Sequence, residues 1–470
     1  MNFWDSNVWG FIDLMGVLLA SLLAANLLKK SFKFLRQSLI PTSVLGGIML
    51  LIISSIYQVS TGKLFFNLEF FGCNGQSMLE VITYHCLALG FIASSLRTVD
   101  GHMNKKRAIE IFDTGITTVS GYLIQGVVGL TITIIAALIL KDFFPAAGCL
   151  LPFGYGQGTG QALNYGGIYE SDFGFVGGRT FGLSIAAMGF ISAAIGGVIY
   201  LNIMKRKGRY KYTDEEILEA LSNEDIQSSD EVPMNGSIDK MSIQIAIVFG
   251  AYVISYIIIR LLSGLVPGFR SVLFGFNFLI GVLVAIAIRR VLQFLRQVKI
   301  VKKQYINPFL MARITGFCFD VMIVAGFAAI QIAFLKRTWP VLLILGIAGL
   351  LVTYTYVSFI CKRLFTTYHD EQFLAMYGML TGTASTGMIL LREVDPEYKG
   401  PVADNLVLQQ VPAMVFGFPI MILATFAPKA PFYTLLMVLA YFLVLQLILF
   451  RRTIKYVFIK DKRKKRKNKE

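Results

Sequence analysis

The sequence predicts an all-α polytopic membrane protein that crosses the bilayer about eleven times. Of its 470 residues, 55% are hydrophobic and only 15% are charged. Soluble domains carry roughly 25% charged residues. The apolar residues occur in stretches of 20 or more, long enough to cross about 30 Å of hydrocarbon as helix. These observations exclude a disordered chain, a disulfide-stabilised scaffold and an ordinary soluble enzyme.

The basic residues account for the net charge of +16 without a nucleic-acid partner, because they lie at the ends of the apolar stretches. The segment 451–470 is strongly basic and predicts an anchor on anionic lipid. The five cysteines show no Cys-x-x-Cys spacing, and four of them fall in apolar segments. They therefore predict small core residues, and no transition-metal site.

Eleven stretches are predicted to form transmembrane helices, in two sets of five with one more near the C-terminus. The first set is 8–28, 39–57, 78–96, 111–139 and 178–204; the second is 241–263, 271–290, 308–335, 338–360 and 401–427; the additional helix is 431–450.

The distribution of Lys and Arg predicts the orientation of the chain. Basic residues gather on the cytoplasmic side of membrane proteins. With alternate crossing, 36 of the 44 Lys and Arg residues fall on one side. We therefore expect a multi-pass protein of the cell membrane, with its N-terminus outside and its C-terminus in the cytoplasm.

The polar stretch 205–240 predicts a cytoplasmic linker between two halves. Its residues Thr213-Asp214-Glu215-Glu216 form a capping box that opens a short helix. The stretch has 36 residues, too few for a core of its own. The expected organisation is an N-terminal repeat (1–204), the linker, a second repeat (241–427), and a further helix with a basic tail (428–470).

Two Gly-rich segments, 143–170 and 373–396, interrupt the pattern of helices. The apolar runs beside them are too short to cross, and each segment must leave on the side where it entered to preserve the charge asymmetry. We expect re-entrant hairpins with non-helical tips, the first entering from outside and the second from inside. Because unpaired backbone groups cannot face lipid, the tips must line a water-filled cavity or pack inside protein.

The tips combine features that suit a small anion and a hard cation. Glycine allows close backbone approach, and the freed N–H and C=O groups stand beside amide and hydroxyl side chains. Tight helix packing through small residues is the other interpretation. The predicted substrate-binding residues are Gly156, Gln157, Gly158, Thr159, Gly160 and Gln161 in the first segment and Gly382, Thr383, Ser385 and Thr386 in the second.

The order of these features predicts two inverted-topology repeats of five helices each. Each hairpin lies between the fourth and fifth helix of its set, and five crossings turn the second half upside down. A short sequence similarity supports the pairing of the two sets. Gly90-Phe91-Ile92-Ala93 in the third helix of the first set matches Gly326-Phe327-Ala328-Ala329 in the third helix of the second set. Many secondary transporters share this architecture and bind substrate where the repeats meet.

The sequence resembles the sodium/glutamate symporter family over about residues 8–427. The resemblance rests on Ile40-Pro41 followed by Gly46-Gly47, on Gly90 followed by Ile92-Ala93-Ser94 and Leu96-Arg97, and on the paired Gly-rich loops. It implies sodium-coupled, elevator-type symport of a small amino-acid or carboxylate anion, glutamate-like. It also implies a homodimer with one mobile, substrate-carrying domain per protomer, and Na⁺ as coupling ion with no cofactor.

Asp320, Thr381 and Asp404 are candidate ligands for the coupling cation. Asp320 lies in the apolar stretch 308–335, where a central charge costs roughly 2.5–3.5 kcal/mol on insertion scales. Such a residue predicts a role in binding a cation or carrying a proton; a salt bridge to Arg313 is the alternative. Proton coupling through Asp320 is the alternative to sodium.

Other function classes find less support in the sequence. Walker, Gly-x-Ser-x-Gly and His-Glu-x-x-His patterns are absent, so an enzyme is not predicted. Channel filters come from copies of one loop around one axis, whereas these two loops differ and are expected to enter from opposite sides. A proton-coupled organic-anion transporter and, after it, a channel remain the alternatives.

Overall fold

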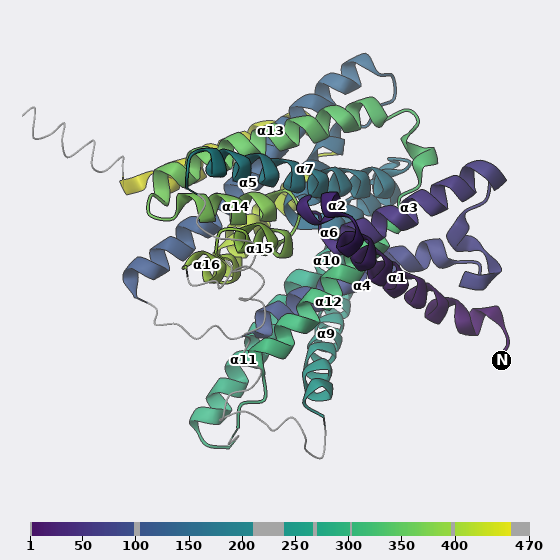
Figure 1. Ribbon diagram of the computed structural model, residues 1–470, viewed down its shortest axis with the longest axis horizontal. Coiled ribbons are helices and arrows are strands. Elements are labelled where there is room, and N and C mark those ends of the chain that lie inside the picture. Colours follow the sequence, from purple (N-terminus) through teal and green to yellow (C-terminus); the bar gives the residue numbers. More distant parts are fainter. Residues whose placement is uncertain are drawn as a thin grey trace, which may run out of the picture.

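The computed structural model describes residues 2–97, 104–209, 239–266, 270–300, 303–395 and 400–452, apart from the side chains of residues 271 and 272. Every regular element in these ranges is a helix (Figure 1). The predicted capping box at 213–216 and most of the basic tail lie outside the described residues. The protein is therefore an all-helical membrane protein, as its composition predicts.

Ten helices of the described part are long and apolar enough to cross a membrane. Each coincides with a predicted stretch to within several residues. They are α1 (Ser6–Ser31), α3 (Thr42–Thr61), α4 (Gly75–Leu96), α5 (Lys105–Ile139), α7 (Gly178–Arg206), α9 (Lys240–Leu265), α11 (Asn277–Gln297), α12 (Pro308–Ala328), α13 (Trp339–Leu364) and α18 (Pro431–Leu449).

The tenth predicted span, 401–427, is a bent pair of helices. It consists of α16 (Val402–Leu408) and α17 (Gln410–Phe426), inclined by 47°. Pro412 explains the break, because a proline has no N–H to donate and its ring clashes with the carbonyl four residues earlier, here that of Leu408. With this pair taken as one span, the described residues provide eleven segments that are long and apolar enough to cross a membrane.

The remaining elements lie between these helices in the sequence. They are α2 (Lys33–Gln37), η1 (Phe65–Asn67), η2 (Glu69–Phe71), η3 (Pro145–Cys149), α6 (Leu150–Phe173), α10 (Arg270–Gly275), η5 (Ile332–Leu335), α14 (His369–Leu380) and α15 (Ala384–Arg392). The two Gly-rich segments form α6 and the pair α14–α15.

The helices form two groups, and each group takes helices from both halves of the chain (Figure 1). The first group contains α1, α3, α4, α9, α11 and α12, with α4 packed against α12 at its centre. The second contains α5–α7 and α13–α18, with α5 packed against α13, α17 and α18. The two groups meet mainly through α6, which contacts α4 and α12. The Gly-rich segment α6 thus lies where the groups join.

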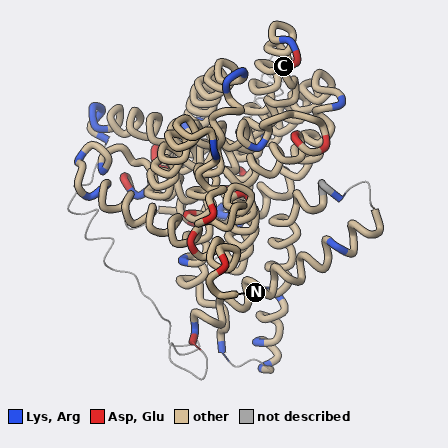
Figure 2. The backbone as a smooth tube through the Cα atoms, turned by 90° about the vertical axis from the view of Figure 1, so that its right-hand side faces the viewer, with Lys and Arg blue, Asp and Glu red and all other residues tan. Residues whose placement is uncertain are grey.

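Charged residues are sparse along the chain and lie mainly near helix ends (Figure 2). Helix ends that the distribution of Lys and Arg assigns to the same side of the membrane contact one another. Arg289 near the end of α11 donates to the Ser95 and Arg97 carbonyls at the end of α4, at 3.1 Å each. Arg451, just beyond α18, pairs with Asp113 near the start of α5 at 2.7 Å. These contacts are as expected for helices that cross alternately.

Candidate functional site

The first Gly-rich segment turns back on itself at a single residue. Helix α6 is interrupted at Gly158, where φ is 79° and ψ is −169°. The rings of Phe153 and Tyr165 stack with centroids 3.9 Å apart, although 12 residues of straight helix span about 18 Å. The arm 150–157 and the arm 159–173 therefore lie side by side, with Gly158 at the tip.

This hairpin is more regular than the sequence predicts. A non-helical tip was expected across the Gly-rich stretch, but both arms are helical up to Gly158. The reason is that most of the glycines serve helix contact: Gly166 faces Gly178 of α7, and Gly182 of α7 faces Ala162. Only Gly158 needs the positive φ that glycine tolerates.

The second Gly-rich segment is also a helical hairpin. Helices α14 and α15 pack against each other, and a Cβ added at Gly378 would lie 2.8 Å from the Cα of Gly387. The turn between them consists of Thr381, Gly382 and Thr383, and Thr383 is the N-cap of α15.

The two tips meet. A Cβ added at Gly158 would lie 3.0 Å from Thr383 Cγ2 and 3.5 Å from the Gly382 carbonyl oxygen. The two residues come from opposite halves of the sequence, more than 200 positions apart. The two Gly-rich segments therefore contact each other, at Gly158 on one side and at Gly382 and Thr383 on the other.

Helices α5, α7 and α12 enclose this junction. The Thr159 hydroxyl donates to the Met322 carbonyl of α12 at 3.3 Å, and Gly189 of α7 faces the Thr381 carbonyl. Gln125 of α5 is fully buried, and its Nε2 donates to the Leu380 carbonyl and to the Thr353 hydroxyl, at 2.8 Å each. The tips therefore lie deep in the protein, and several helices fix their positions.

Other predicted substrate residues take different positions. Gly156 packs against the Tyr122 ring, and Gly160 packs against Leu87. Gln161 is fully buried and its Nε2 has no hydrogen-bond partner among the described residues, whereas Ser385 is partly exposed. Thr386 is buried beside Thr383, with the two hydroxyl oxygens 3.4 Å apart. The structure thus brings part of the predicted set to the junction and assigns helix packing to Gly156 and Gly160.

Gln157 reaches a cavity beside the junction. This cavity measures about 60 Å³ and is lined by Gln157, Tyr122, Gln410, Met414 and several apolar side chains. A larger cavity of about 400 Å³ shares Gln410 and Met414 with it and extends to arginines of α4 and α11. The sequence analysis did not single out Tyr122 and Gln125. The signal that could have identified them is the presence of polar side chains inside the apolar stretch 111–139.

Two predicted cation ligands lie away from the tips. Met322 faces Gly158, and Asp320 precedes it by two residues, about 200° around the helix. The Asp320 side chain accordingly lies on the other side of α12, where its carboxylate neighbours Ser43 of α3. Neither this carboxylate nor that of Asp404 lies at the tips, so neither is placed to share a cation with the tip carbonyls. Thr381 is close to the junction, but its hydroxyl donates to the Tyr377 carbonyl at 2.6 Å.

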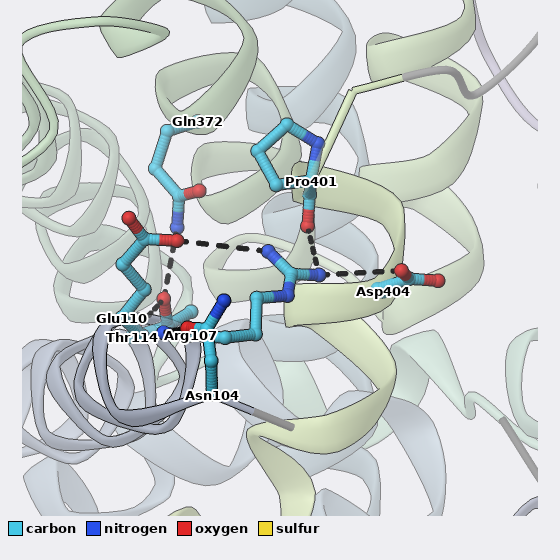
Figure 3. Close-up of polar contacts among 7 residues, drawn as sticks. All are labelled: Asn104, Arg107, Glu110, Thr114, Gln372, Pro401 and Asp404. Carbon is cyan, nitrogen blue, oxygen red and sulfur yellow. Dashed lines mark hydrogen bonds and ion pairs between the residues drawn. The ribbon is translucent and has the colours of Figure 1, made fainter. Parts of the chain in front are cut away.

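Asp404 belongs to an ion-pair network at the start of α5 (Figure 3). Arg107 Nη2 lies 3.2 Å from Asp404 Oδ2 and donates to the Pro401 carbonyl at 3.0 Å. Arg107 Nη1 lies 3.7 Å from Glu110 Oε2. On α5, Arg107 precedes Gln125 by 18 residues, which corresponds to about 27 Å along the helix. Asp404 therefore lies far from the tips and fixes α16 to α5.

The same network includes hairpin α14–α15. Gln372 Nε2 donates to the Thr114 hydroxyl at 3.4 Å, and that hydroxyl donates to the Glu110 carbonyl at 2.7 Å (Figure 3). Burial and the nearby charge of Glu110 raise the pKa of Tyr368 to about 12, so its hydroxyl stays protonated at neutral pH. These contacts join α5, α14 and α16 at the end that is opposite to the tips.

Comparison with known proteins adds no assignment: no family model matches the chain, and no curated protein matches it. Within the described ranges, no group of three or more His, Cys, Asp or Glu side chains is arranged to hold a metal ion. The geometry of the two hairpins is therefore the feature of the molecule that bears on its function.

Proposed function

We propose that this protein is a secondary active transporter that carries a small amino-acid or carboxylate anion, glutamate-like, together with Na⁺. The observation that carries the proposal is the meeting of two broken helical hairpins at Gly158 and at Gly382–Thr383. Paired broken helices from two halves of a chain are the usual binding element of secondary transporters.

Each hairpin tip brings together the C-terminus of one helix and the N-terminus of the next. The arm 159–173 and helix α15 begin at the junction, and their first N–H groups favour an anion. The arm 150–157 and helix α14 end there, and their last C=O groups favour a small hard cation. An anion and Na⁺ held at one junction would each stabilise the other, which is the basis proposed for symport.

The grouping of helices supports alternating access of the elevator type. The second group combines α5–α7 from the first half with α13–α17 from the second, and α18 is added to it. This sharing is expected of two inverted-topology repeats with re-entrant hairpins. In the proposed cycle the second group carries both tips past the first group, in a homodimer in the cell membrane with its C-terminus in the cytoplasm.

Uptake by proteoliposomes tests the proposal. We expect saturable accumulation of at least one anion from a panel of amino acids, dicarboxylates and tricarboxylates, driven by an inward sodium gradient. Uptake that ignores sodium but collapses with the pH gradient would assign proton coupling instead. A conductance without saturation, measured as single-channel current, would replace the transporter with a channel.

The position of Asp404 leads to a prediction about coupling. Asp404→Asn should leave the sodium concentration for half-maximal uptake unchanged, because the carboxylate pairs with Arg107 at the far end of α5. Its side chain is 54% exposed, so the loss of stability should stay below about 1 kcal/mol. Thr383→Val, at the junction, should raise the half-maximal concentration of substrate or sodium in the same assay. A large shift in Asp404→Asn alone would return this residue to the cation site.

A further inference from the structure

A cavity of about 400 Å³ opens between the two helix groups at their basic ends. Its walls come from the end of α4, from residues 282–293 of α11, and from α16 and α17. Three arginines line it, namely Arg97, Arg289 and Arg290, together with the polar side chains of Ser94, Ser95 and Gln293. Among the residues that the structure describes, no Asp or Glu lines it.

The arginines are arranged to keep positive charge at this opening. Arg289 Nη1 donates to the carbonyls of Ser95 and Arg97, at 3.1 Å each, and so is held against the end of α4. Arg290 follows on α11 and is exposed. A cleft with charge of one sign and apolar walls focuses the field and raises the local concentration of counter-ions. Val407, Val411 and Met414 supply the apolar walls here.

The cavity leads toward the hairpin junction. Gln410 and Met414 line both this cavity and the smaller one that contains Gln157, and Gln157 directly precedes the tip residue Gly158. At the opposite end of the helices the two groups are held together: Arg179 of α7 lies 3.4 Å from Glu80 of α4 and 3.5 Å from Glu170 of α6. The basic cavity is thus on the side where the groups are apart.

We propose that this cavity is an anion-binding vestibule, in which Arg97, Arg289 and Arg290 hold a small carboxylate on its path to or from the tips. The inference rests on the proposed function for the direction of that path, and on the cavity alone for the binding. Arginine suits the role because its planar guanidinium pairs with carboxylate in two-pronged geometry. A phospholipid phosphate shares this chemistry, so the experiment must separate the two sources.

Thiol-modification rates test the vestibule without any transport measurement. Ser94→Cys is made in a Cys73→Ser background, because Cys73 is the exposed native cysteine among the five. The protein is placed in phosphatidylcholine nanodiscs and treated with methanethiosulfonates bearing either a sulfonate or a trimethylammonium group. At position 94 we measure the ratio of the modification rate with the anionic reagent to the rate with the cationic reagent. We expect this ratio to exceed the same ratio at Cys73 of the parent protein by on the order of tenfold. Gln293→Cys provides a second reporter on the cavity wall if Ser94→Cys does not fold.

Two charge variants with the same substitution locate the effect. Arg290→Gln should remove most of the preference, whereas Arg296→Gln should keep it, because Arg296 lies on the same helix outside the cavity lining. Sodium succinate should lower the modification rate of the anionic reagent at position 94. It should leave the rate at Cys73 of the parent protein unchanged. Equal rates for the two reagents, or equal effects of the two variants, would overturn the vestibule.

A measurement in nanodiscs that contain phosphatidylglycerol decides between a free carboxylate and a lipid phosphate as the bound anion. If phosphatidylglycerol in the nanodisc slows the anionic reagent and succinate does not, the occupant is a lipid headgroup and the proposal is wrong. The result also separates the vestibule from the proposed transport function. A charge preference with succinate protection would uphold the vestibule even if no anion of the panel is taken up. Sodium-driven uptake with no charge preference would uphold the transporter and remove the vestibule.

Discussion

Valine at position 158 should abolish uptake, because the two hairpin tips could no longer meet. The backbone at Gly158 has φ 79° and ψ −169°, a region that only glycine adopts readily, at a cost of about 1–3 kcal/mol for other residues. The first added carbon would lie 3.0 Å from Thr383 Cγ2, before the branches of valine are counted. We expect no measurable sodium-dependent uptake in proteoliposomes, with the folded protein still recovered as a single peak in gel filtration.

Position 382 should give the same result for a different reason. Gly382 has no unusual φ, but its added Cβ would lie 2.8 Å from Thr386 Oγ1 and 3.0 Å from the Phe190 ring. Gly250→Val is the matched control, since Gly250 lies on α9 with nothing within 4 Å of an added Cβ. Full uptake by both tip variants would mean that the tips serve packing alone, and the substrate site would have to lie elsewhere.

Gln125→Leu should cause the second largest loss, in stability as well as in transport. The Gln125 amide is fully buried and donates to the Leu380 carbonyl, the last residue of α14 before the second tip. It also donates to the Thr353 hydroxyl of α13. Leucine removes both bonds, and each buried group left unpaired costs about 1–3 kcal/mol. Thermal unfolding in detergent should show the lower stability, and uptake should fall by on the order of tenfold for each 1.4 kcal/mol lost at the site.

Threonines of α13 provide the controls for Gln125. Thr353→Val removes one of the two acceptors and should reproduce part of the effect. Thr355→Val makes the same chemical change two residues on, where the hydroxyl is exposed and bonds only within its own helix, and it should be neutral. If Gln125→Leu proved as stable and active as the parent protein, Gln125 would not be the residue that holds the second tip in place.

Local composition was enough to predict the helices and the two places where they break. A stretch such as 431–450 is apolar on every side, so its length alone indicates a span. The glycines and hydroxyl residues at 154–167 and 381–387 are equally local signals, because few other segments need backbone contact so densely. Pro412 is a local signal for the bend at 408–410 as well.

Only the tertiary structure decided which helices pack together and which polar groups meet. A membrane helix is apolar toward lipid and toward its neighbours, so the sequence carries little signal for the face that packs inward. The mixing of both halves in each helix group, and the contact of Gly158 with Thr383, depend on such faces. For the same reason the sequence, which marks Asp320 and Asp404 only as charges near or within spans, does not determine whether they lie at the tips. The helix rotation at Asp320 and the partner Arg107 at Asp404 place them elsewhere.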